Sequence, residues 1–541
     1  MLANAPTTGT LRPCRADSVN FDTTENIYIE GDNLEALKLL QETYLGKIKM
    51  IFIDPPYNTG NDFVYKDDFS QERRQFLTDS GQQDGDGNRL VKNFDSNGRF
   101  HTNWLNMIYP RLRLAKDLLT EDGVAFISID DNEQENLKKC CIEIFGRDNV
   151  ETLIWNKEAE GSSGTLKQIN TTRRVHEYVI CAFKNIKNTQ FTKVREALKG
   201  KEDELYTANL AVNSDKENPE HINYYTITNP SGDSFTHQWK WGRDEINRLI
   251  SEDLIYWGSD GHKQPRLIIP TDGRRTTYLS SILNYGGTTV GRKDFEELLS
   301  DGAEFPYPKP VLLIKKLIET ATDKQDTVLD FFSGSATTAH AVMQLNSEDG
   351  GKRRFIMVQY PELIADNSPS FKAGYRNICE IGRQRIRLAG ERIKAEAIQR
   401  NGASDLDIGF RVLKCDTSNM KNVYYEPSEY TAKIFASLTD NIKEDRTRED
   451  LLFQVMLDLG VLLSAKIDEV DIGGKTVFNV ADGELIACFD DDVTAETVTA
   501  VASLRPRYFV IRDSSMADDS VASNFEQIFA AHSPETDRRV L

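Results

Sequence analysis

The sequence predicts an α/β protein built on a doubly wound, Rossmann-like sheet, with an inserted unit and a C-terminal α/β domain. Near-continuous apolar runs at 48–53 and 327–332 are typical of strands buried on both faces of a parallel sheet. Segments with helical apolar spacing lie between the predicted strands, which is the alternation expected of βαβ units. Between 186 and 300 this alternation stops, and the content of aromatic residues and of Gly, Asp and Ser rises.

The chain divides into five parts on this pattern. Residues 1–24 are mixed and polar, and we expect a poorly ordered lead-in. Residues 25–185 and 301–400 carry the two halves of the sheet domain, and 186–300 form the insertion between them. Residues 401–541 have strand and helix signals of their own, so we expect a separate, acidic α/β domain there.

The elements of the first half follow from apolar spacing and breaker residues. Leu37, Leu40 and Tyr44 recur at helical spacing after a Gly-Asp-Asn turn. Residues 61–100 are rich in Asp, Gly, Gln and Asn, and we expect a long loop, which in a compact domain is usually functional. A helix near 105–119, interrupted or kinked by Pro110, precedes further strands. These strands are expected at 124–129, 153–155 and 178–183.

The second half repeats the same alternation. The expected elements are a helix at 311–320, a strand at 327–332, a helix through 342, a strand at 355–359 and a basic helix at 376–400.

The net charge of −19 is unevenly distributed along the 541 residues. Residues 401–541 carry 26 acidic and 14 basic side chains, whereas 1–400 carry 59 and 52. Residues 371–400 hold eight Lys or Arg against three Glu, so a polyanion can bind there locally although the tail is acidic. Global charge therefore neither supports nor excludes DNA as a partner.

Cysteine usage and hydropathy indicate a cytoplasmic protein. The seven cysteines are odd in number and include no C-x-x-C pair, which argues against a disulfide framework and a zinc ribbon. No apolar run is long enough to span a bilayer, and no signal peptide is expected at the start.

The segment Asp54-Pro55-Pro56-Tyr57 follows the apolar run 48–53 and is suited to hold an exocyclic amine. Ligands of open α/β sheets bind beyond the carboxyl ends of such strands. Proline has no N–H, so the ladder stops and the carbonyl groups stay available as acceptors beside the Asp54 carboxylate. Tyr57 adds a flat face for stacking a base. The alternative is an ordinary Pro-Pro turn with a solvated Asp.

A second ligand site is predicted where the strand 327–332 runs into a glycine turn and a helix. The turn contains one glycine, Gly334, and neither G-x-G-x-x-G nor G-K-[ST], so a pyrophosphate or P-loop ligand is not expected. A single tight turn suits S-adenosylmethionine (SAM), and the alternative is plain strand–turn–helix packing. The candidate cofactor residues of this strand and turn are Asp330, Phe331, Phe332 and Gly334.

The acid that follows the next strand usually holds a ribose diol. Here that strand ends in Gln359, so Glu362 is the candidate, with a solvated turn acid as the alternative.

The two sites together resemble the DNA amino-methyltransferases of the β class, in which the catalytic motif precedes the SAM motif. Several longer strings are similar, more specifically, to the Mod subunit of type III restriction–modification systems. These strings are GDNLEALKLL, IDPPYNTGNDFVY, WLNMIYPRLRLAKDLLTEDGVAFISIDDNE, KPVLLIKKLIE and TVLDFFSGSATTAHAVM. The resemblance covers most of 25–400 and continues more weakly in the tail, at IRDSSMADDSVASNFEQIF.

This resemblance implies a site-specific methyltransferase that transfers a methyl group from SAM to adenine N6 in double-stranded DNA. It implies catalytic roles for Asp54, Pro55, Pro56 and Tyr57, and cofactor contacts from the Phe331–Gly334 turn, Asp32 and Lys309. The implied partners are DNA, a second copy of the chain and a restriction (Res) subunit with ATPase and nuclease activity. Target recognition would lie in the insertion.

Two features depart from the family pattern. The acid-bearing strand ends VQYPE, where many methyltransferases place an acid directly, which puts the ribose contact in doubt. The region before Gly31 is also short for the family.

The mechanism expected of these residues is positioning plus electrostatics. Acceptors at Asp54 and the Pro55 carbonyl bond the amine and favour a pyramidal nitrogen, whose lone pair then attacks the methyl group in line. A base inside a duplex cannot reach such a pocket, so the base must flip out and stack on Tyr57. The chemistry needs no metal, and no metal-ligand spacing is recognised. The alternatives are a solitary methyltransferase, a cytosine-N4 or RNA amino-methyltransferase, and a non-catalytic specificity adaptor.

Overall fold

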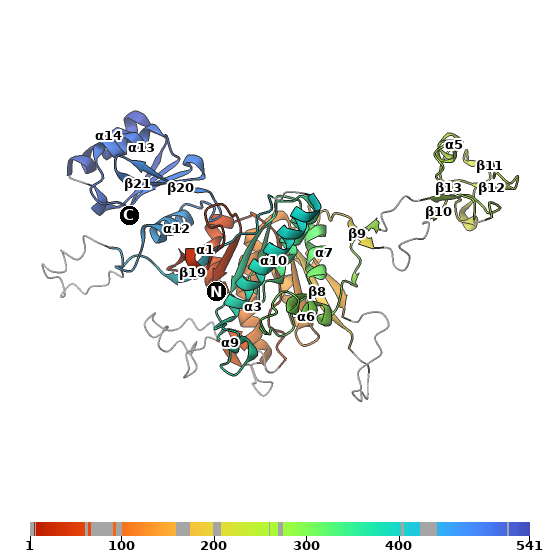
Figure 1. The fold of residues 1–541 in the computed structure, drawn as a ribbon, viewed down its shortest axis with the longest axis horizontal. Coiled ribbons are helices and arrows are strands. Elements are labelled where there is room, and N and C mark those ends of the chain that lie inside the picture. Colours follow the sequence, from red (N-terminus) through yellow and green to blue (C-terminus); the bar gives the residue numbers. More distant parts are fainter. Residues whose placement is uncertain are drawn as a thin grey trace. The chain divides into compact units, whose positions relative to one another are not determined.

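The structure is a computed structural model that describes most of the chain. The described residues are 5, 7–59, 63–65, 90–92, 100–157, 172, 174–197, 207–258, 260–268, 274–401, 405–421, 441–516 and 519–541. The chain forms two compact units, one made of 1–192 with 279–541 and the other of 193–278. Figure 1 shows the elements of both.

A ten-stranded sheet lies at the centre of the larger unit, in the order β1-β19-β2-β18-β17-β3-β6-β8-β7-β16. The six neighbouring strands from β19 to β6 are parallel to one another, whereas β1 and β8 run antiparallel to their neighbours. The strands are β1 (Gly9–Pro13), β2 (Ile27–Glu30), β3 (Ile48–Ile53), β6 (Leu119–Ile129), β7 (Val150–Asn156), β8 (His176–Phe183), β16 (Ile282–Leu283), β17 (Thr327–Asp330), β18 (Arg354–Gln359) and β19 (Arg411–Thr417).

Helices cover both faces of this sheet, which confirms the predicted doubly wound α/β fold. One apolar core joins the sheet to α1 (Asn33–Tyr44), α3 (Phe100–Leu118), α4 (Gln134–Phe145) and α12 (Arg448–Asp458). The opposite core joins it to α7 (Val311–Ala321), α8 (Thr337–Asp349) and α10 (Ile378–Asn401). Strand β3 is buried on both sides, since Ile51 and Ile53 enter the first core and Met50 and Phe52 the second.

Shorter elements complete the larger unit. They are α6 (Thr288–Glu296), α9 (Pro369–Lys372) and the antiparallel pair of β4 (Phe63–Tyr65) and β5 (Leu90–Lys92). The long loop expected at 61–100 falls mostly outside the described residues.

A second, five-stranded sheet forms the C-terminal part of the larger unit. Its strands are β20 (Ile467–Ile472), β21 (Lys475–Val480), β22 (Leu485–Cys488), β23 (Tyr508–Ile511) and β24 (Asp537–Val540), in that order. The helices α13 (Ala495–Ser503) and α14 (Asp519–His532) accompany it. Phe509, Phe525 and Phe529 pack together in one core of this part, whereas Phe478 and Phe489 belong to the core shared with the central sheet.

The smaller unit has a core of its own, formed by Trp239, Ile246, Leu249 and other apolar residues. Its elements are β9 (Val194–Ala197), β10 (Thr207–Asn209), β11 (Tyr224–Thr228), β12 (Ser234–Gln238), α5 (Arg243–Ser251), β13 (Ile255–Tyr256), β14 (Arg266–Ile268) and β15 (Arg274–Thr277). The compact unit spans 193–278, so it is narrower than the predicted insertion at 186–300. The difference arises because β16 joins the central sheet beside β7.

Three local expectations differ from the structure. The lead-in contains strand β1, which pairs along its length with β19, so this stretch is ordered by an edge of the sheet. Strand β19 in turn belongs to the central sheet rather than to a separate domain beginning at 401. Pro110 is buried inside α3 without ending the helix, because a proline removes one backbone bond and tertiary packing can offset that loss.

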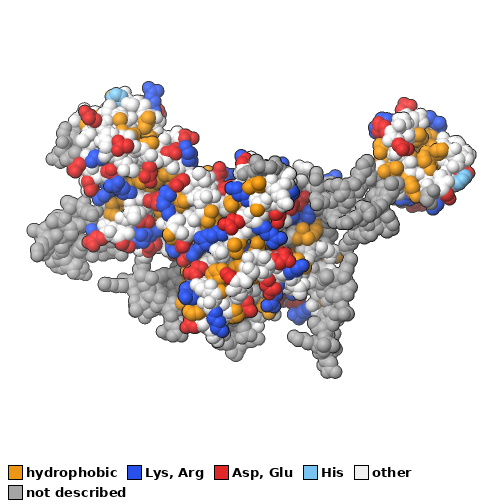
Figure 2. Space-filling view, in the orientation of Figure 1, with side chains coloured by type: hydrophobic (Ala, Val, Ile, Leu, Met, Phe, Trp, Pro, Cys, Tyr) orange, Lys and Arg blue, Asp and Glu red, His pale blue; other side chains and the backbone are white. Residues whose placement is uncertain are grey.

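The basic helix also differs from expectation. Arg385 is fully buried in α10 and donates to the hydroxyls of Ser335 and Thr337. Arg383 is buried as well and pairs with Glu30. These side chains are therefore part of the interior rather than a surface for a polyanion. Figure 2 shows acidic and basic side chains intermixed over the visible face. Among the residues that the structure describes, no helix is long and apolar enough to cross a membrane.

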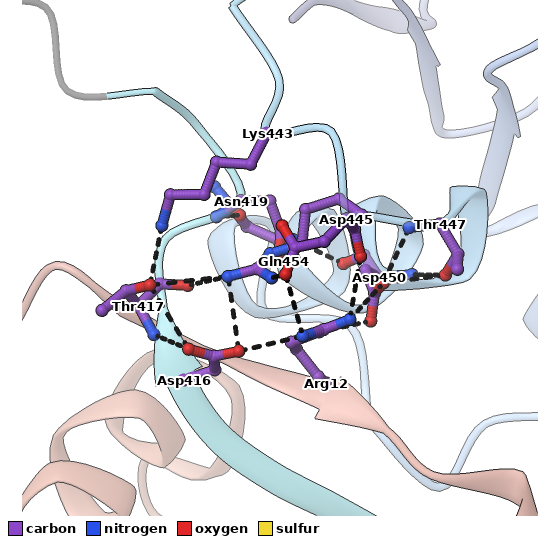
Figure 3. Close-up of polar contacts among 10 residues, drawn as sticks. Arg12, Asp416, Thr417, Asn419, Lys443, Asp445, Thr447, Asp450 and Gln454 are labelled. Atoms are coloured by element: carbon purple, nitrogen blue, oxygen red, sulfur yellow. Dashed lines mark hydrogen bonds and ion pairs between the residues drawn. The ribbon is translucent and has the colours of Figure 1, made fainter.

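An ion-pair network ties strand β1 to α12 (Figure 3). Arg12 Nε donates to Asp450 Oδ1 at 3.0 Å, and Arg12 Nη1 lies 3.0 Å from Asp416. The Asp450 side chain is only 3% exposed, and it also caps α12 by accepting from the Thr447 backbone N–H. A charge that is buried to this degree is stable only when it is paired.

We therefore predict that Arg12→Met destabilises the larger unit by about 3 kcal/mol, because Asp450 then stays buried without its main partner. The measurement is urea unfolding followed by far-UV circular dichroism. The matched control is Arg292→Met, which breaks the exposed pair with Glu296 and should leave the free energy of unfolding close to the wild-type value. Equal effects of the two substitutions would contradict the assigned importance of the network.

Candidate active site at the ends of strands β3 and β17

The two predicted motifs lie side by side although they are far apart in the sequence. Strands β3 and β17 are parallel neighbours, with Met50 opposite Val328 and Ile51 opposite Leu329. The helices that follow them lie on opposite faces, α3 in one core and α8 in the other. The carboxyl ends of β3 and β17 therefore form a topological switch point, where open α/β sheets bind ligands.

The backbone after β3 is fixed by a buried tryptophan. Trp104 on α3 is fully buried, and its indole N–H donates to the Pro56 carbonyl at 2.7 Å. No donor among the described residues contacts the Pro55 carbonyl, which leaves it available as an acceptor. Asn58 has a positive φ of 59° and donates to Glu133 Oε1 at 2.6 Å. These contacts hold the motif as a defined turn instead of a solvated loop.

The Asp54 carboxylate is oriented by two donors. The Ser128 hydroxyl at the end of β6 donates to Oδ1 at 2.6 Å, and Lys309 Nζ donates to Oδ2 at 2.6 Å. Lys309 is only 7% exposed in its side chain and lies just before α7. The sequence predicted Lys309 as a cofactor contact, and in the structure it forms an ion pair with Asp54 of the motif. Two ionised oxygens offer about four lone-pair sites, so Asp54 keeps acceptor capacity for a further donor.

Tyr57 lies beside this pair. Lys309 Nζ is 5.0 Å from the centroid of the Tyr57 ring and 5.7 Å from that of Trp155. The Tyr57 hydroxyl donates to Glu177 Oε2 at 2.9 Å. Burial raises the pKa of Tyr57 well above its ordinary value, and the negative charges of Asp54 and Glu177 add to the effect. Tyr57 therefore stays a neutral hydrogen-bond donor.

The end of β17 is organised by a buried acid. Asp330 accepts from the Thr338 hydroxyl at 2.6 Å and from the Phe332 N–H at 3.1 Å. Burial raises the pKa of Asp330 to about 7. The Phe331 carbonyl accepts from the Asn33 side chain at 2.7 Å, which links the turn to the start of α1. Asp330 and Phe331 therefore shape the turn from inside.

The turn itself needs a glycine. Gly334 has a φ of +48°, and a Cβ built on it would lie 3.0 Å from the Phe305 ring. Its N–H donates to Gln359 Oε1 at 2.7 Å. Ala336 precedes α8 with a φ of 60° and gives the helix no side-chain cap. Phe332 is nearly buried beside Phe331.

Two observations test whether SAM fits this turn. The Ser333 hydroxyl is buried and has no hydrogen-bond partner in the described part of the protein. The amino-terminal N–H groups of α8 have no side-chain cap, and such groups attract anions such as a carboxylate. An orphaned donor and an uncapped helix start fit the polar amino-acid end of SAM.

Asp32 and Glu362 occupy different settings. Asp32 caps α1 by accepting from the Leu34 and Glu35 N–H groups, at 2.9 and 3.1 Å. It also lies 3.6 Å from the buried Arg111. The structure thus gives Asp32 a role in holding α1. Glu362 follows β18 and is half-buried, and burial raises its pKa to about 7.

The site contains residues that the sequence motifs did not indicate. Ser128, Lys157 and Glu177 come from or directly follow β6, β7 and β8, the strands beyond β3 in the sheet. No local signal marks them, because their convergence depends on the order of the strands. Among the described residues, no group of three or more His, Cys, Asp or Glu side chains is placed to hold a metal ion.

Comparison with known proteins finds one matching family model and several relatives of this chain. Residues 48–375 match the family model described as DNA methylase. The StyLTI Mod subunit of a type III restriction-modification enzyme from Salmonella typhimurium is 35% identical over 404 residues, covering 72% of this chain and 60% of that protein. The EcoPI Mod subunit of Escherichia phage P1 is 32% identical, covering 84% and 74%. The EcoP15I Mod subunit of Escherichia coli is 30% identical, covering 93% and 81%.

The buried Asp330 predicts a pH dependence of stability. Its pKa of about 7 in the folded protein exceeds the value of about 4 in an unfolded chain, so folding favours the protonated form. The stability contributed by the protonated carboxyl is lost as pH rises through 7. Asp330→Asn cannot ionise, so its free energy of unfolding relative to wild type should increase between pH 5 and pH 8. Urea unfolding across this range measures it, and a constant difference would show that Asp330 does not titrate there.

Proposed function

We propose that Asp54–Tyr57 direct methylation of adenine N6 in double-stranded DNA, in a chain that belongs to the DNA methylase family and, within it, to the Mod subunits of type III restriction–modification enzymes. Membership of this family makes the chain a SAM-dependent DNA methyltransferase. The observation that supports this most is the position of Asp54 at the end of β3, directly beside the glycine turn of β17. An amine acceptor and a cofactor turn on neighbouring strands are what methyl transfer to an exocyclic amine requires.

We assign the cofactor to the turn after β17. Phe331, Phe332 and Gly334 would line it, and the Ser333 hydroxyl and the start of α8 would bind its amino-acid end. Glu362 would accept from the ribose hydroxyls. When bound, SAM supplies an electrophilic methyl group on a sulfonium that departs as a neutral thioether.

Asp54 and the Pro55 carbonyl would act on the nucleophile. The amine of adenine is a weak nucleophile because its lone pair is delocalised into the ring. Two acceptors that bond its N–H groups favour a pyramidal nitrogen and direct the lone pair toward the methyl group. The Ser128 and Lys309 contacts hold the Asp54 carboxylate still while it does so. The base must leave the duplex to reach Asp54, and the Tyr57 ring supplies the stacking surface.

The remaining assignments rest on family membership. We propose that the compact unit 193–278 reads the target sequence. We also propose that the protein acts in the cytoplasm as a homodimer, with a Res subunit supplying ATPase and nuclease activity. Single-molecule sequencing of DNA from cells with and without the gene tests the central claim, because it reports the modified base and its sequence context. A new N6-methyladenine motif is expected, and a cytosine-N4 mark or no mark would overturn the proposal.

We predict that Asp54→Asn lowers methyl transfer at least about a hundredfold, because the amide replaces an acceptor with a donor at the amine. Dissociation constants for SAM, measured by isothermal titration calorimetry, should stay close to the wild-type value, since Asp54 lies outside the β17 turn. Retained SAM binding also shows that the variant is folded. Methylation at the wild-type rate would exclude Asp54 as the amine acceptor.

The ribose assignment for Glu362 makes a separate prediction. Only the ionised carboxylate accepts from both ribose hydroxyls, and the pKa of Glu362 is about 7 in the protein without cofactor. SAM binding should therefore tighten several-fold from pH 6 to pH 8. Glu362→Gln should bind SAM more weakly and without this pH dependence, whereas the exposed Glu391→Gln should behave as wild type. An unchanged pH profile in the Glu362 variant would assign the ribose contact elsewhere.

A further inference from the structure

Two separate ion pairs contact Tyr57, one at its ring face and one at its hydroxyl. One pair, Lys309 with Asp54, lies against its ring face, with Lys309 Nζ 5.0 Å from the ring centroid. The other pair, Lys157 with Glu177, receives its hydroxyl. The second pair is not part of either sequence motif.

Glu177 is brought to the site by the sheet. It is the second residue of β8, and the antiparallel pairing of β8 with β6 places its start at the same edge as the end of β6. It also lies opposite Trp155 of β7 in the β7–β8 pairing. The carboxylate can thus reach Tyr57 across the end of β6, where Ser128 contacts Asp54.

The contacts of Glu177 suit a fixed anchor. The residue is 8% exposed, and its two oxygens are separately engaged: Oε1 accepts from Lys157 Nζ at 2.6 Å and Oε2 from the Tyr57 hydroxyl at 2.9 Å. A carboxylate at this depth would be costly without a cationic partner, and Lys157 supplies one. A hydrogen bond to an ionised acceptor is about twice as strong as one between neutral groups. The bond therefore restrains the Tyr57 ring more firmly than packing alone.

We propose that Glu177 is a positioning residue for the transfer reaction, with Lys157 as its counter-ion. Its function is to fix the plane of the Tyr57 ring, so that a base stacked on that ring presents its amine to Asp54. This inference rests on the proposed function. It explains why the motif ends in tyrosine, since a phenylalanine has the same stacking face but no hydroxyl for Glu177.

The test compares Glu177→Ala, Glu177→Gln, Tyr57→Phe and the double variant Glu177→Ala/Tyr57→Phe. The substrate is a duplex with the recognition sequence mapped by sequencing, and a second duplex carries 2-aminopurine at the target position. Single-turnover methyl transfer, the dissociation constant for SAM and 2-aminopurine fluorescence are measured for each protein. The matched control is Glu348→Gln, which removes the charge from an ion pair of the same 2.6 Å length, Lys315 with Glu348, between α7 and α8.

Glu177→Ala and Tyr57→Phe should each slow transfer about 10- to 100-fold, the effect of misplacing a reacting group by a fraction of an ångström to an ångström. The double variant should be no slower than the slower single variant, because both remove the same hydrogen bond. Glu177→Gln keeps an acceptor and should recover part of the rate. The 2-aminopurine fluorescence should rise in Glu177→Ala and Tyr57→Phe as stacking of the base loosens. The SAM affinity of these variants should stay near the wild-type value, and Glu348→Gln should behave as wild type in all three measurements.

Additive losses in the double variant, or an unchanged transfer rate in Glu177→Ala, would overturn the positioning role. If Asp54→Asn is inactive while the Glu177 variants transfer normally, the proposed function stands and this inference fails. If the wild-type protein transfers no methyl group, both fail together.

Discussion

The pairing of β3 with β17 is the constraint on which the site depends. Each strand alone ends in an ordinary turn, and only their parallel hydrogen bonding puts the Asp54 carboxylate beside the Gly334 turn. The pairing is stable because both strands are buried between two helical layers. A change in register would move Asp54 relative to the turn by more than 3 Å per residue, which is more than methyl transfer tolerates.

Electrostatics at this edge follow a simple arrangement. Two carboxylates, Asp54 and Glu177, face two ammonium groups, Lys309 and Lys157, at the same 2.6 Å separation, with Tyr57 between the pairs. Each charge is paired, so the site is close to neutral although its members are partly or largely buried. Most of the net negative charge of the chain is carried by residues 401–541, outside the strands that hold these two pairs.

The sequence allowed the two motifs and the α/β fold to be predicted because each depends on residues that are close in the chain. Asp54–Tyr57 and the Gly334 turn carry their chemistry in a few consecutive positions, and the strands before them are marked by apolar runs. Glu177, Ser128 and Lys157 could not be found in this way, because they meet only through the order β3-β6-β8-β7. The pairing of β1 with β19 was missed for the same reason. Composition overstated the basic surface of this helix, because it does not show that Arg383 and Arg385 are buried while Arg392 and Arg400 stay exposed.

Lys309 shows how the local and the non-local parts of the site meet. Its Nζ makes a hydrogen bond to Asp54, the acceptor proposed for the target amine, and a contact with the face of Tyr57, the ring on which the base is proposed to stack. An incoming base must therefore share the Asp54 carboxylate with an ammonium group that is already in place. The sharing is feasible because a carboxylate accepts several donors, and because Ser128 and Lys309 fix its orientation without using all of its lone pairs. In the proposed mechanism the second ion pair then sets the geometry. With Lys309 near the ring face of Tyr57, the Glu177 hydrogen bond holds the far end of the ring, so that a base stacked on it would present its amine to Asp54.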